Sequence, residues 1–399
     1  MAFVRRDSRF RECLGSVAFP YEPNRYVLYV SPACPWANRT MTVAKLRGLT
    51  NKELPIVRVH PTWQATKPGV DEHCGWVFRA AREPVMPLAL KKLQDEAASS
   101  AKEKPVGALS ALDEVEQGSS SGTTGQNQKE SQKMLGTEGV AAFVTAAGEI
   151  STPNCDPDSL SGWDCRTLRE LYEHCGESLE AGGKFTTPLI FCRKTQKIVN
   201  NESSEIIVQL DAWPDDAVDG TIKRSAFAPE TLNPGALQDE MRKLDDFTYH
   251  KINNGVYKCG FCRTQAAYET AIDDLMEGMQ FLEERFRSQT EDFREKPFLF
   301  GKTLTLSDVR LFQTLIRMDE CYVIYFKCFP ASLLFFPEVL KYTARVWAAP
   351  EVRSSTHLHD CKLHYFSSHP HLNPFAVVPR DTGIWDRLFN MTEDGGAYA

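Results

Sequence analysis

The sequence predicts an α/β domain followed by an all-α domain. Strand and helix patterns alternate near the amino terminus, whereas helical periodicity dominates beyond Ala236. A length of 399 residues also suggests about two domains. We therefore expect a first domain at residues 1–213, a connector at 214–234, a second domain at 235–372 and a C-terminal tail at 373–399.

The first domain is predicted to open with a strand, a loop and a helix. Residues 25–30 are rich in β-branched and aromatic residues, and a short loop that contains Cys34 follows them. We expect a helix at 36–46 and a second strand at 54–60. Cys34 then lies immediately before the helix, and Pro35 takes the first helical position, which favours proline.

A segment without periodicity is predicted to interrupt the first domain. It covers residues 79–161, and Ser, Gly, Gln, Lys and Glu dominate its centre at 97–133. We interpret it as a mostly disordered insertion in a loop, with a flexible linker between two domains as the alternative. After it, the pattern predicts a helix at 165–172, a hairpin with strands at 185–191 and 198–199, and a helix entered through Asn200-Asn-Glu-Ser-Ser-Glu205.

The second domain is predicted to be an α bundle. Apolar residues recur at steps of three and four from Tyr268 to Phe286, a stripe typical of a packed helix face. Thr305-Leu-Ser-Asp308 has the spacing of a capping box and introduces the apolar face from Leu311 to Ile316.

The composition narrows the class of protein. A net charge of -7 lacks the basic excess that binds nucleic acid, so we expect no nucleic-acid partner. No stretch is apolar enough to span a bilayer and no secretory signal is visible, so we expect a cytoplasmic protein without a membrane partner. Most of the twelve cysteines should be free thiols in that reducing compartment.

Cys34 is the cysteine with the most informative position. Unpaired N–H groups and partial positive charge at a helix start favour a thiolate, the form that attacks. Ala37 stands where a dithiol redox protein would have its second cysteine, so Cys34 has no local resolving thiol. This arrangement suits a mixed disulfide that a second small thiol must release. An inert buried cysteine is the alternative.

Several segments, in order along the chain, carry a resemblance to a known family. They are Tyr29–Thr40, Gly75–Phe78, Asn200–Ile206, Gly255–Phe261, Leu304–Phe312, Tyr322–Cys328, His364-Tyr365, Asn373-Pro374 and Val378-Pro379. Together they resemble the glutathionyl-hydroquinone reductases, the Xi class of glutathione transferases. The resemblance covers Phe10 to about Pro379 except the insertion. It implies a thioredoxin-like N-terminal domain and a glutathione-transferase-type helical C-terminal domain.

The resemblance also implies roles for individual residues. The implied catalytic residues are the nucleophile Cys34 and the three tyrosines that face the electrophile, Tyr257, Tyr322 and Tyr365. The implied glutathione-binding residues are Trp76, Thr187, Pro188, Glu202 and Ser203. The implied reaction is glutathione-dependent reduction of glutathionyl-hydroquinones through a Cys34–glutathione mixed disulfide. Glutathione would be a co-substrate, a glutathionylated aromatic compound the substrate, no metal or tightly bound cofactor is expected, and the protein would be a homodimer.

Some positions depart from the family pattern. Asn38 and Tyr325 stand where histidine is usual, which puts substrate fit and thiolate stabilisation in question. Cys259-Gly-Phe-Cys262 is unlike the family and has C-x-x-C spacing, so a paired redox or metal role is an alternative there. The histidines between His357 and His371 could bind a metal or form a solvent-facing helix end. Two other functions stay open: an omega-type thioltransferase or dehydroascorbate reductase, and a non-catalytic glutathione-transferase-like binding module.

Overall fold

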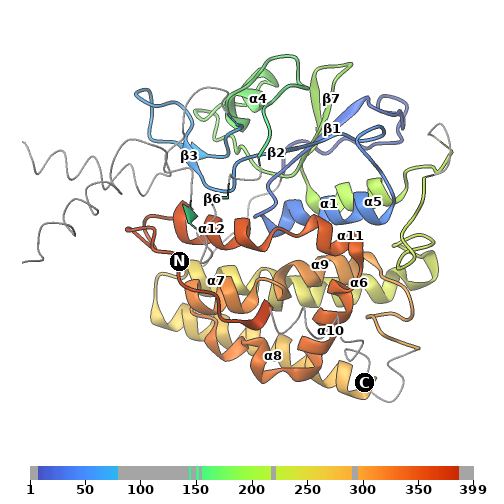
Figure 1. The fold of residues 1–399 in the computed structure, drawn as a ribbon, viewed down its shortest axis with the longest axis vertical. Coiled ribbons are helices and arrows are strands. Elements are labelled where there is room, and N and C mark those ends of the chain that lie inside the picture. Colours follow the sequence, from blue (N-terminus) through green and yellow to red (C-terminus); the bar gives the residue numbers. More distant parts are fainter. Residues whose placement is uncertain are drawn as a thin grey trace, which may run out of the picture.

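The computed structural model describes residues 8–79, 155–216, 222–289 and 295–385, together with the short strands β5 (Phe143–Val144) and β6 (Ile150–Ser151). Most of the expected insertion at 79–161 and the end of the expected tail lie outside these residues. Figure 1 shows a sheet-containing layer above a layer of helices. The expected α/β plus all-α architecture is confirmed.

The sheet of the first domain has four strands in the order β2-β1-β7-β8. Strand β2 is parallel to β1, β7 is antiparallel to β1, and β8 is antiparallel to β7. The expected βαβ opening and the later hairpin are therefore both confirmed. The elements are β1 (Tyr26–Val30), α1 (Pro35–Leu46), β2 (Ile56–Arg58), β7 (Leu189–Cys192), β8 (Lys197–Asn200) and α5 (Ser203–Asp211). A separate two-stranded sheet pairs β3 (Gln64–Ala65) with β4 (Cys74–Gly75).

Helices cover both faces of the four-stranded sheet. Successive side chains of a strand point to opposite faces, so Leu28 and Val30 pack towards α1 and α5, while Val27 and Tyr29 pack towards α4 (Leu168–His174). In Figure 1, α4 lies above the sheet and α1 and α5 lie below it. Every residue of β1 is buried, because both faces of the strand are covered.

The last residues of the expected insertion are part of the folded domain. Asp156 pairs with Arg58 of β2 at 2.8 Å, and its backbone N–H donates to the Arg58 carbonyl. The buried carboxylate of Asp158 accepts from the Tyr29 hydroxyl at 2.7 Å and from the backbone N–H groups of Ser161 and Cys165. These contacts fasten residues 155–161 to the edge of the sheet.

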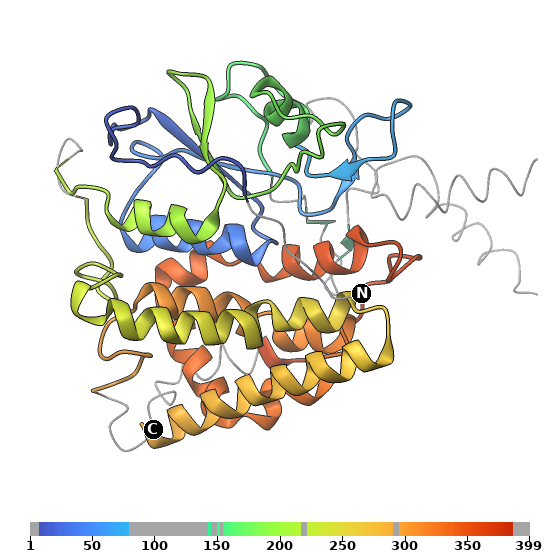
Figure 2. The same ribbon diagram turned by 180° about the vertical axis from the view of Figure 1, so that it is seen from behind.

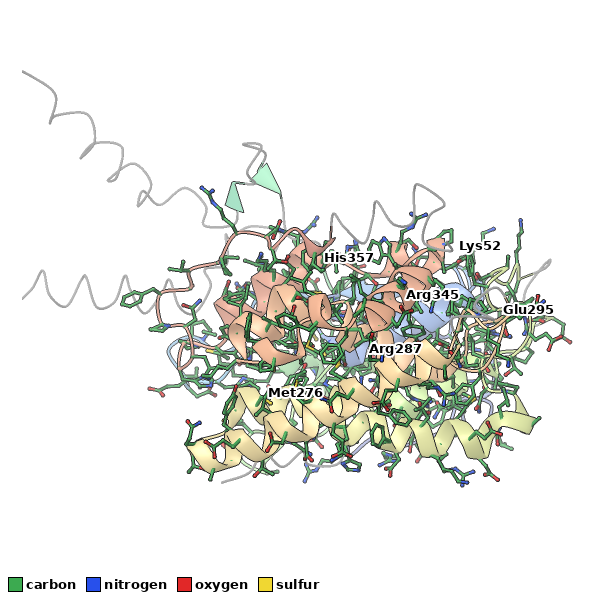
Figure 3. The ribbon with its side chains drawn as sticks, turned by 90° about the horizontal axis from the view of Figure 1, so that it is seen from below. Lys52, Met276, Arg287, Glu295, Arg345 and His357 are labelled. Atoms are coloured by element: carbon green, nitrogen blue, oxygen red, sulfur yellow. The ribbon has the colours of Figure 1, made fainter. Side chains whose placement is uncertain are left out.

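The second domain is built from α-helices and two π-helical turns. Its α-helices are α6 (Gln238–Thr248), α7 (Gly255–Phe261), α8 (Gln265–Ser288), α9 (Leu306–Leu315), α10 (Pro337–Trp347), α11 (Pro350–Ser355) and α12 (Leu358–Ser368); the π-helical turns are η2 (Tyr249–Asn253) and η4 (Met318–Val323), and short 3₁₀ turns are η1 (Gly235–Leu237), η5 (Phe329–Ala331) and η6 (Leu333–Phe335). Figure 2 shows α8 on the side of this domain farthest from the sheet. Met276 and Arg287, labelled in Figure 3, lie along it.

The expected capping box at the start of α9 is confirmed. The buried Asp308 carboxylate accepts from the Thr305 backbone N–H and hydroxyl at 2.8 and 2.7 Å, and also from the Leu299 N–H and the Tyr342 hydroxyl. One carboxylate therefore fixes the start of the central helix and ties it to α10.

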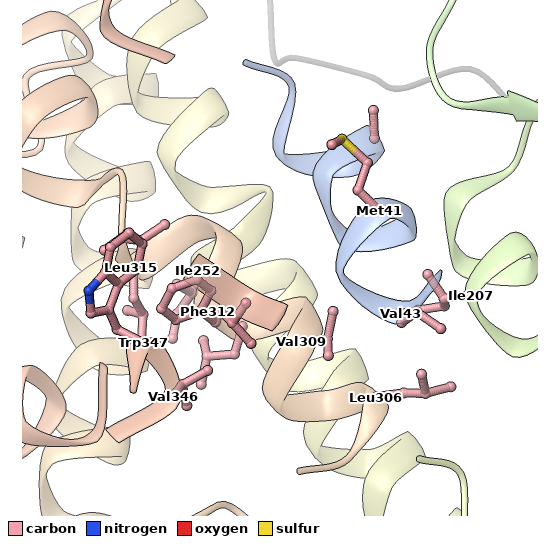
Figure 4. Close-up of a cluster of buried hydrophobic side chains, with 14 of the residues drawn as sticks. Met41, Val43, Ile207, Ile252, Leu306, Val309, Phe312, Leu315, Val346 and Trp347 are labelled. Atoms are coloured by element: carbon pink, nitrogen blue, oxygen red, sulfur yellow. The ribbon is translucent and has the colours of Figure 1, made fainter. Parts of the chain in front are cut away.

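The two domains share a hydrophobic interface beside α1, the helix that Cys34 precedes. Met41 and Val43 of α1 and Ile207 of α5 lie near Leu306 and Val309 of α9 in Figure 4. Apolar burial of this kind is worth about 25 cal/mol per Å² of surface removed from water. The interface therefore fixes α1, and with it Cys34, against the helical domain.

Two further observations concern the whole described chain. No helix within its described ranges is long and apolar enough to cross a membrane. All twelve cysteines lie in those ranges and are free, as expected.

Candidate active site

Cys34 is the N-cap residue of α1, as the sequence predicts. Its side chain is half-buried and packs against the apolar clusters on both faces of the sheet. Its carbonyl accepts from the Asn38 N–H at 2.8 Å, and its Sγ lies 4.0 Å from the Thr187 carbonyl oxygen. The thiol thus sits at the domain junction beside the Thr187-Pro188 turn.

A cavity of about 290 Å³ lies beside this turn, and three of the expected glutathione-binding residues line it: Thr187, Pro188 and Ser203. The Thr187–Pro188 peptide bond is cis. The buried Thr187 hydroxyl has no hydrogen-bond partner within the described part of the chain, so it can bond a ligand. Arg9, Lys184 and Glu177 also line the cavity, and Arg9 pairs there with Glu177 at 3.0 Å.

Glu202 and Ser203 do not face the same space. Ser203 is the first residue of α5, whereas Glu202 is its N-cap and accepts from the Ser204 N–H at 3.1 Å and from the Ser8 hydroxyl at 2.9 Å. Glu202 lines a second, larger cleft of about 650 Å³ together with Trp36 and Asp245. The two residues expected to bind glutathione at the start of α5 therefore line two different cavities.

Trp76 follows β4 and is buried, but it does not line the smaller cavity. Its ring stacks on His364 of α12, with centroids 4.8 Å apart and an interplanar angle of 25°. The His364 Nδ1 atom lies 2.7 Å from the Pro61 carbonyl oxygen, and burial holds the pKa of His364 well below its usual value. Trp76 thus supports the histidine that precedes Tyr365.

The three expected tyrosines form one cluster, although they come from α7, η4 and α12. The hydroxyl of Tyr365 lies 2.7 Å from that of Tyr257 and 2.9 Å from that of Tyr322. Burial, followed by the negative charge of nearby Cys34, raises the pKa of Tyr257 to about 12. Burial also raises the pKa values of Tyr322 and Tyr365 well above the usual value. The cluster is protonated at neutral pH and lies close to the nucleophile.

The two departures from the family pattern have defined places in the structure. Asn38 is fully buried; its side-chain oxygen accepts from Arg317 at 2.9 Å, and its amide donates to the Ser355 carbonyl of α11. The Tyr325 hydroxyl donates to the His369 carbonyl at 3.3 Å. The sequence analysis missed Arg317, whose signal was a cation directly after the apolar face of α9.

The interpretation of the histidine-rich segment as a solvent-facing helix end is wrong for His364 and His369, whereas His359 and His371 are exposed. His364 and His369 are buried in α12 and the turn after it, because this helix packs between the two domains. The described residues contain no group of three or more side chains arranged to hold a metal. In the C-x-x-C segment, the Cys262 thiol donates to the Cys259 carbonyl at 3.0 Å, while the side-chain partner of Cys259 is Cys328.

Comparison with known proteins agrees with this geometry. The family model "Glutathione S-transferase, C-terminal domain" matches residues 265–345. Glutathione S-transferase omega-like 2 of Saccharomyces cerevisiae is 31% identical over 395 residues, which cover 95% of this chain and 94% of the relative. The glutathionyl-hydroquinone reductase PcpF of Sphingobium chlorophenolicum is 27% identical, with coverage of 94% and 88%.

Solved structures show the same similarity. The Xi glutathione transferase ECM4 from Saccharomyces cerevisiae superposes with a TM-score of 0.70 at 26% identity, and the match covers 96% of this chain and 97% of that chain. The glutathione-bound YqjG of Escherichia coli gives a TM-score of 0.64 at 25% identity, with coverage of 93% and 92%.

A thioredoxin-like domain joined to a helical domain is the architecture of the glutathione transferases. The chain belongs to the glutathione transferase family, in its Xi class. It is therefore a member of a family of glutathione-dependent enzymes.

Proposed function

We propose that the protein reduces glutathionyl-hydroquinones to hydroquinones, with Cys34 as nucleophile and glutathione as co-substrate. The observation that carries the proposal is the cluster of three hydroxyls next to Cys34. Protonated phenols can hydrogen-bond the oxygens of a hydroquinone and supply a proton to its ring. The two relatives that are named glutathionyl-hydroquinone reductases support this substrate class.

The first step breaks the bond between the ring carbon and sulfur. The Cys34 thiolate attacks the thioether sulfur, a disulfide forms between Cys34 and glutathione, and the electron pair of the broken bond stays on the ring carbon. That carbon takes a proton, which the cluster of Tyr257, Tyr322 and Tyr365 is placed to deliver. The hydroquinone leaves with hydrogen where sulfur was attached.

The second step regenerates the thiol. Ala37 leaves Cys34 without a neighbouring resolving cysteine, so a second glutathione must attack the mixed disulfide. Its thiolate bonds to the sulfur of the first glutathione, and Cys34 leaves as a thiolate. The proton that the second glutathione loses replaces the one given to the ring. Oxidised glutathione is the product.

Each glutathione-binding role has a structural argument. The Thr187 hydroxyl lacks a partner among the described residues and can bond glutathione, and the Thr187 carbonyl lies 4.0 Å from the Cys34 Sγ. Ser203 and Lys184 line the same cavity and support binding of a carboxylate there. Glu202 offers a carboxylate to the ammonium group at the start of α5. We propose that Pro188 shapes the wall of this site and that Trp76 supports α12 beside it by stacking on His364.

The test uses the full-length protein with glutathione and a glutathionylated model hydroquinone, and chromatography quantifies free hydroquinone and oxidised glutathione. We expect turnover by the wild type and by the control variant Cys13→Ala, which removes an exposed thiol, and none by Cys34→Ala. Turnover by Cys34→Ala contradicts the mechanism. If the protein reduces dehydroascorbate or a small mixed disulfide but releases no hydroquinone, it is an omega-type enzyme. If it is inactive on every substrate, it is a binding module.

Two further proposals rest on the resemblance. We propose a homodimer, which light scattering of the purified protein tests by mass. We also propose that the protein is cytoplasmic, which cell fractionation with an antibody against the full chain tests.

A further inference from the structure

Arg317 is a buried cation whose hydrogen-bond acceptors are all neutral. It follows α9 directly, precedes η4, and has no exposed surface. Its guanidinium donates to the carbonyl and side-chain oxygens of Gln313 at 2.7 and 2.9 Å, to the Pro32 carbonyl at 3.2 Å and to the Asn38 side-chain oxygen at 2.9 Å. Within the described ranges, no carboxylate forms an ion pair with it, and its Nε–H has no partner.

The contacts of Arg317 lead directly to the nucleophile. Pro32 belongs to the loop that ends at Cys34, and the backbone N–H of Asn38 donates to the Cys34 carbonyl at 2.8 Å. The Cys361 thiol of α12 approaches the same Pro32 carbonyl at 3.7 Å. The guanidinium therefore connects the end of α9 with the Cys34 loop and the first turn of α1.

Arg317 also lies beside the tyrosine cluster. Burial raises the pKa values of Tyr257, Tyr322 and Tyr365, and the positive charge of Arg317 opposes this rise at all three. A buried charge without a counter-ion costs free energy, and such a cost is expected to persist where the charge has a function. Here the groups that gain from the charge are those that become anionic during the reaction.

We propose that Arg317 is a positioning residue that favours the anionic states of Cys34 and the tyrosine cluster through its unneutralised charge. Its hydrogen bonds to Pro32 and Asn38 hold the Cys34 loop in reach of that charge. The part of this proposal that concerns the tyrosine cluster rests on the proposed function. The effect on the thiol does not, because it can be measured without an aromatic substrate.

Arg317 keeps its charge at neutral pH, whereas the histidines around it are neutral. Burial lowers the pKa of His357 to about 4 and that of His364 well below its usual value, so both rings are neutral at pH 7. The side chains that interact with the guanidinium by hydrogen bonds or electrostatically are Asn38 of α1, Gln313 of α9, Cys321 and Tyr322 of η4, Tyr257 of α7, and His357, Cys361, His364 and Tyr365 at or in α12.

The substitution Gln313→Glu distinguishes the effect of the Arg317 charge from the effect of its hydrogen bonds. The Gln313 side chain is buried, its oxygen accepts from Arg317, and its amide donates to the Thr42 hydroxyl at 3.0 Å. A glutamate of the same shape keeps the first contact and can accept from the Thr42 hydroxyl, because that hydroxyl can rotate. The substitution therefore neutralises Arg317 without removing it. Arg317→Lys keeps the charge, and Arg317→Met removes both charge and hydrogen bonds.

The experiment measures the rate of Cys34 alkylation by iodoacetamide against pH in the full-length wild type and the three variants, with mass spectrometry of the Cys34 peptide as readout. Thermal unfolding of each variant is the check on folding. We expect Gln313→Glu to unfold at the wild-type temperature or above, and its alkylation midpoint to move up by about 1 pH unit, as loss of a nearby opposite charge implies. Arg317→Met should show the same shift, and Arg317→Lys should stay near the wild type.

A wild-type midpoint in Gln313→Glu overturns the proposal, whether or not Arg317→Met folds. A shift in both Arg317 variants without one in Gln313→Glu also overturns it, because contacts and not charge would then be responsible. If the midpoint shifts as expected but the wild type releases no hydroquinone from its conjugate, only the proposed function fails.

Discussion

Tyr365→Phe tests the tyrosine cluster directly, because the Tyr365 hydroxyl lies within hydrogen-bond distance of the hydroxyls of both Tyr257 and Tyr322. The substitution deletes the 2.7 Å contact with Tyr257 and the 2.9 Å contact with Tyr322. The ring keeps its neighbours, including Phe326 with centroids 5.5 Å apart, so no cavity forms. Two buried hydrogen bonds at about 1 kcal/mol each give an expected loss of about 2 kcal/mol in the free energy of unfolding.

The expected effect on catalysis is much larger than the effect on stability. A positioned proton donor contributes roughly 10²- to 10⁴-fold to a rate, so kcat for hydroquinone release should fall by at least about 100-fold. The assay compares kcat at saturating glutathione with Cys34 alkylation, which should continue because the thiol is intact. Linked groups act as a unit, so the kcat of the double variant Tyr257→Phe/Tyr365→Phe should be only slightly lower than that of the less active single variant. A Tyr365→Phe enzyme within about threefold of wild-type kcat would refute proton delivery by the cluster.

Two other substitutions test the surroundings of the site. Burial raises the pKa of Asp360 to about 7, so the native state holds a proton that the unfolded state has lost above its ordinary pKa, and stability falls as pH rises towards 7. Asp360→Asn should therefore raise the unfolding temperature more at pH 8 than at pH 5, and equal shifts at both pH values would contradict this. A Cβ added at Gly260 would lie 2.2 Å from the Phe326 ring, whose plane stacks on Tyr322. Gly260→Ala should lower the free energy of unfolding by about 1–3 kcal/mol in chemical denaturation and reduce hydroquinone turnover, and wild-type values of both would contradict the crowding.

The sequence predicted the elements that position Cys34 because local patterns determine them. The strand before the loop, the proline at the first helical position and the missing second cysteine are all readable within a dozen residues. The capping box before α9 is equally local, since its two members are three residues apart. Periodicity also separated the sheet domain from the helical domain.

The tyrosine cluster could be predicted only through the family resemblance. Tyr257, Tyr322 and Tyr365 come from three separate elements, and no periodic pattern links such distant positions. Taken alone, each tyrosine is more typical of a structural position than of a catalytic one. Their three hydroxyls become a single unit only when α7, η4 and α12 pack together.

The prediction for the histidine-rich segment was wrong at His364 for a related physical reason. Polarity in a sequence shows which side chains can hydrogen-bond, but not whether the fold supplies their partners. His364 finds the Pro61 carbonyl and the face of Trp76, residues about 300 positions earlier in the chain, so its ring can be buried without charge. A pattern that suggested solvent or metal therefore belongs to the domain interface.

The same reasoning gives the departure at Asn38 a meaning that its sequence position could not. A histidine there would be a second titratable group beside the guanidinium, and its protonation at low pH would add a like charge. An asparagine offers Arg317 an acceptor and the Ser355 carbonyl a donor, and it stays neutral at every pH. Of the residues at positions 38 and 317, only Arg317 then contributes a charge near Cys34. Asn38 therefore leaves the electrostatics around Cys34 independent of a histidine proton at this position.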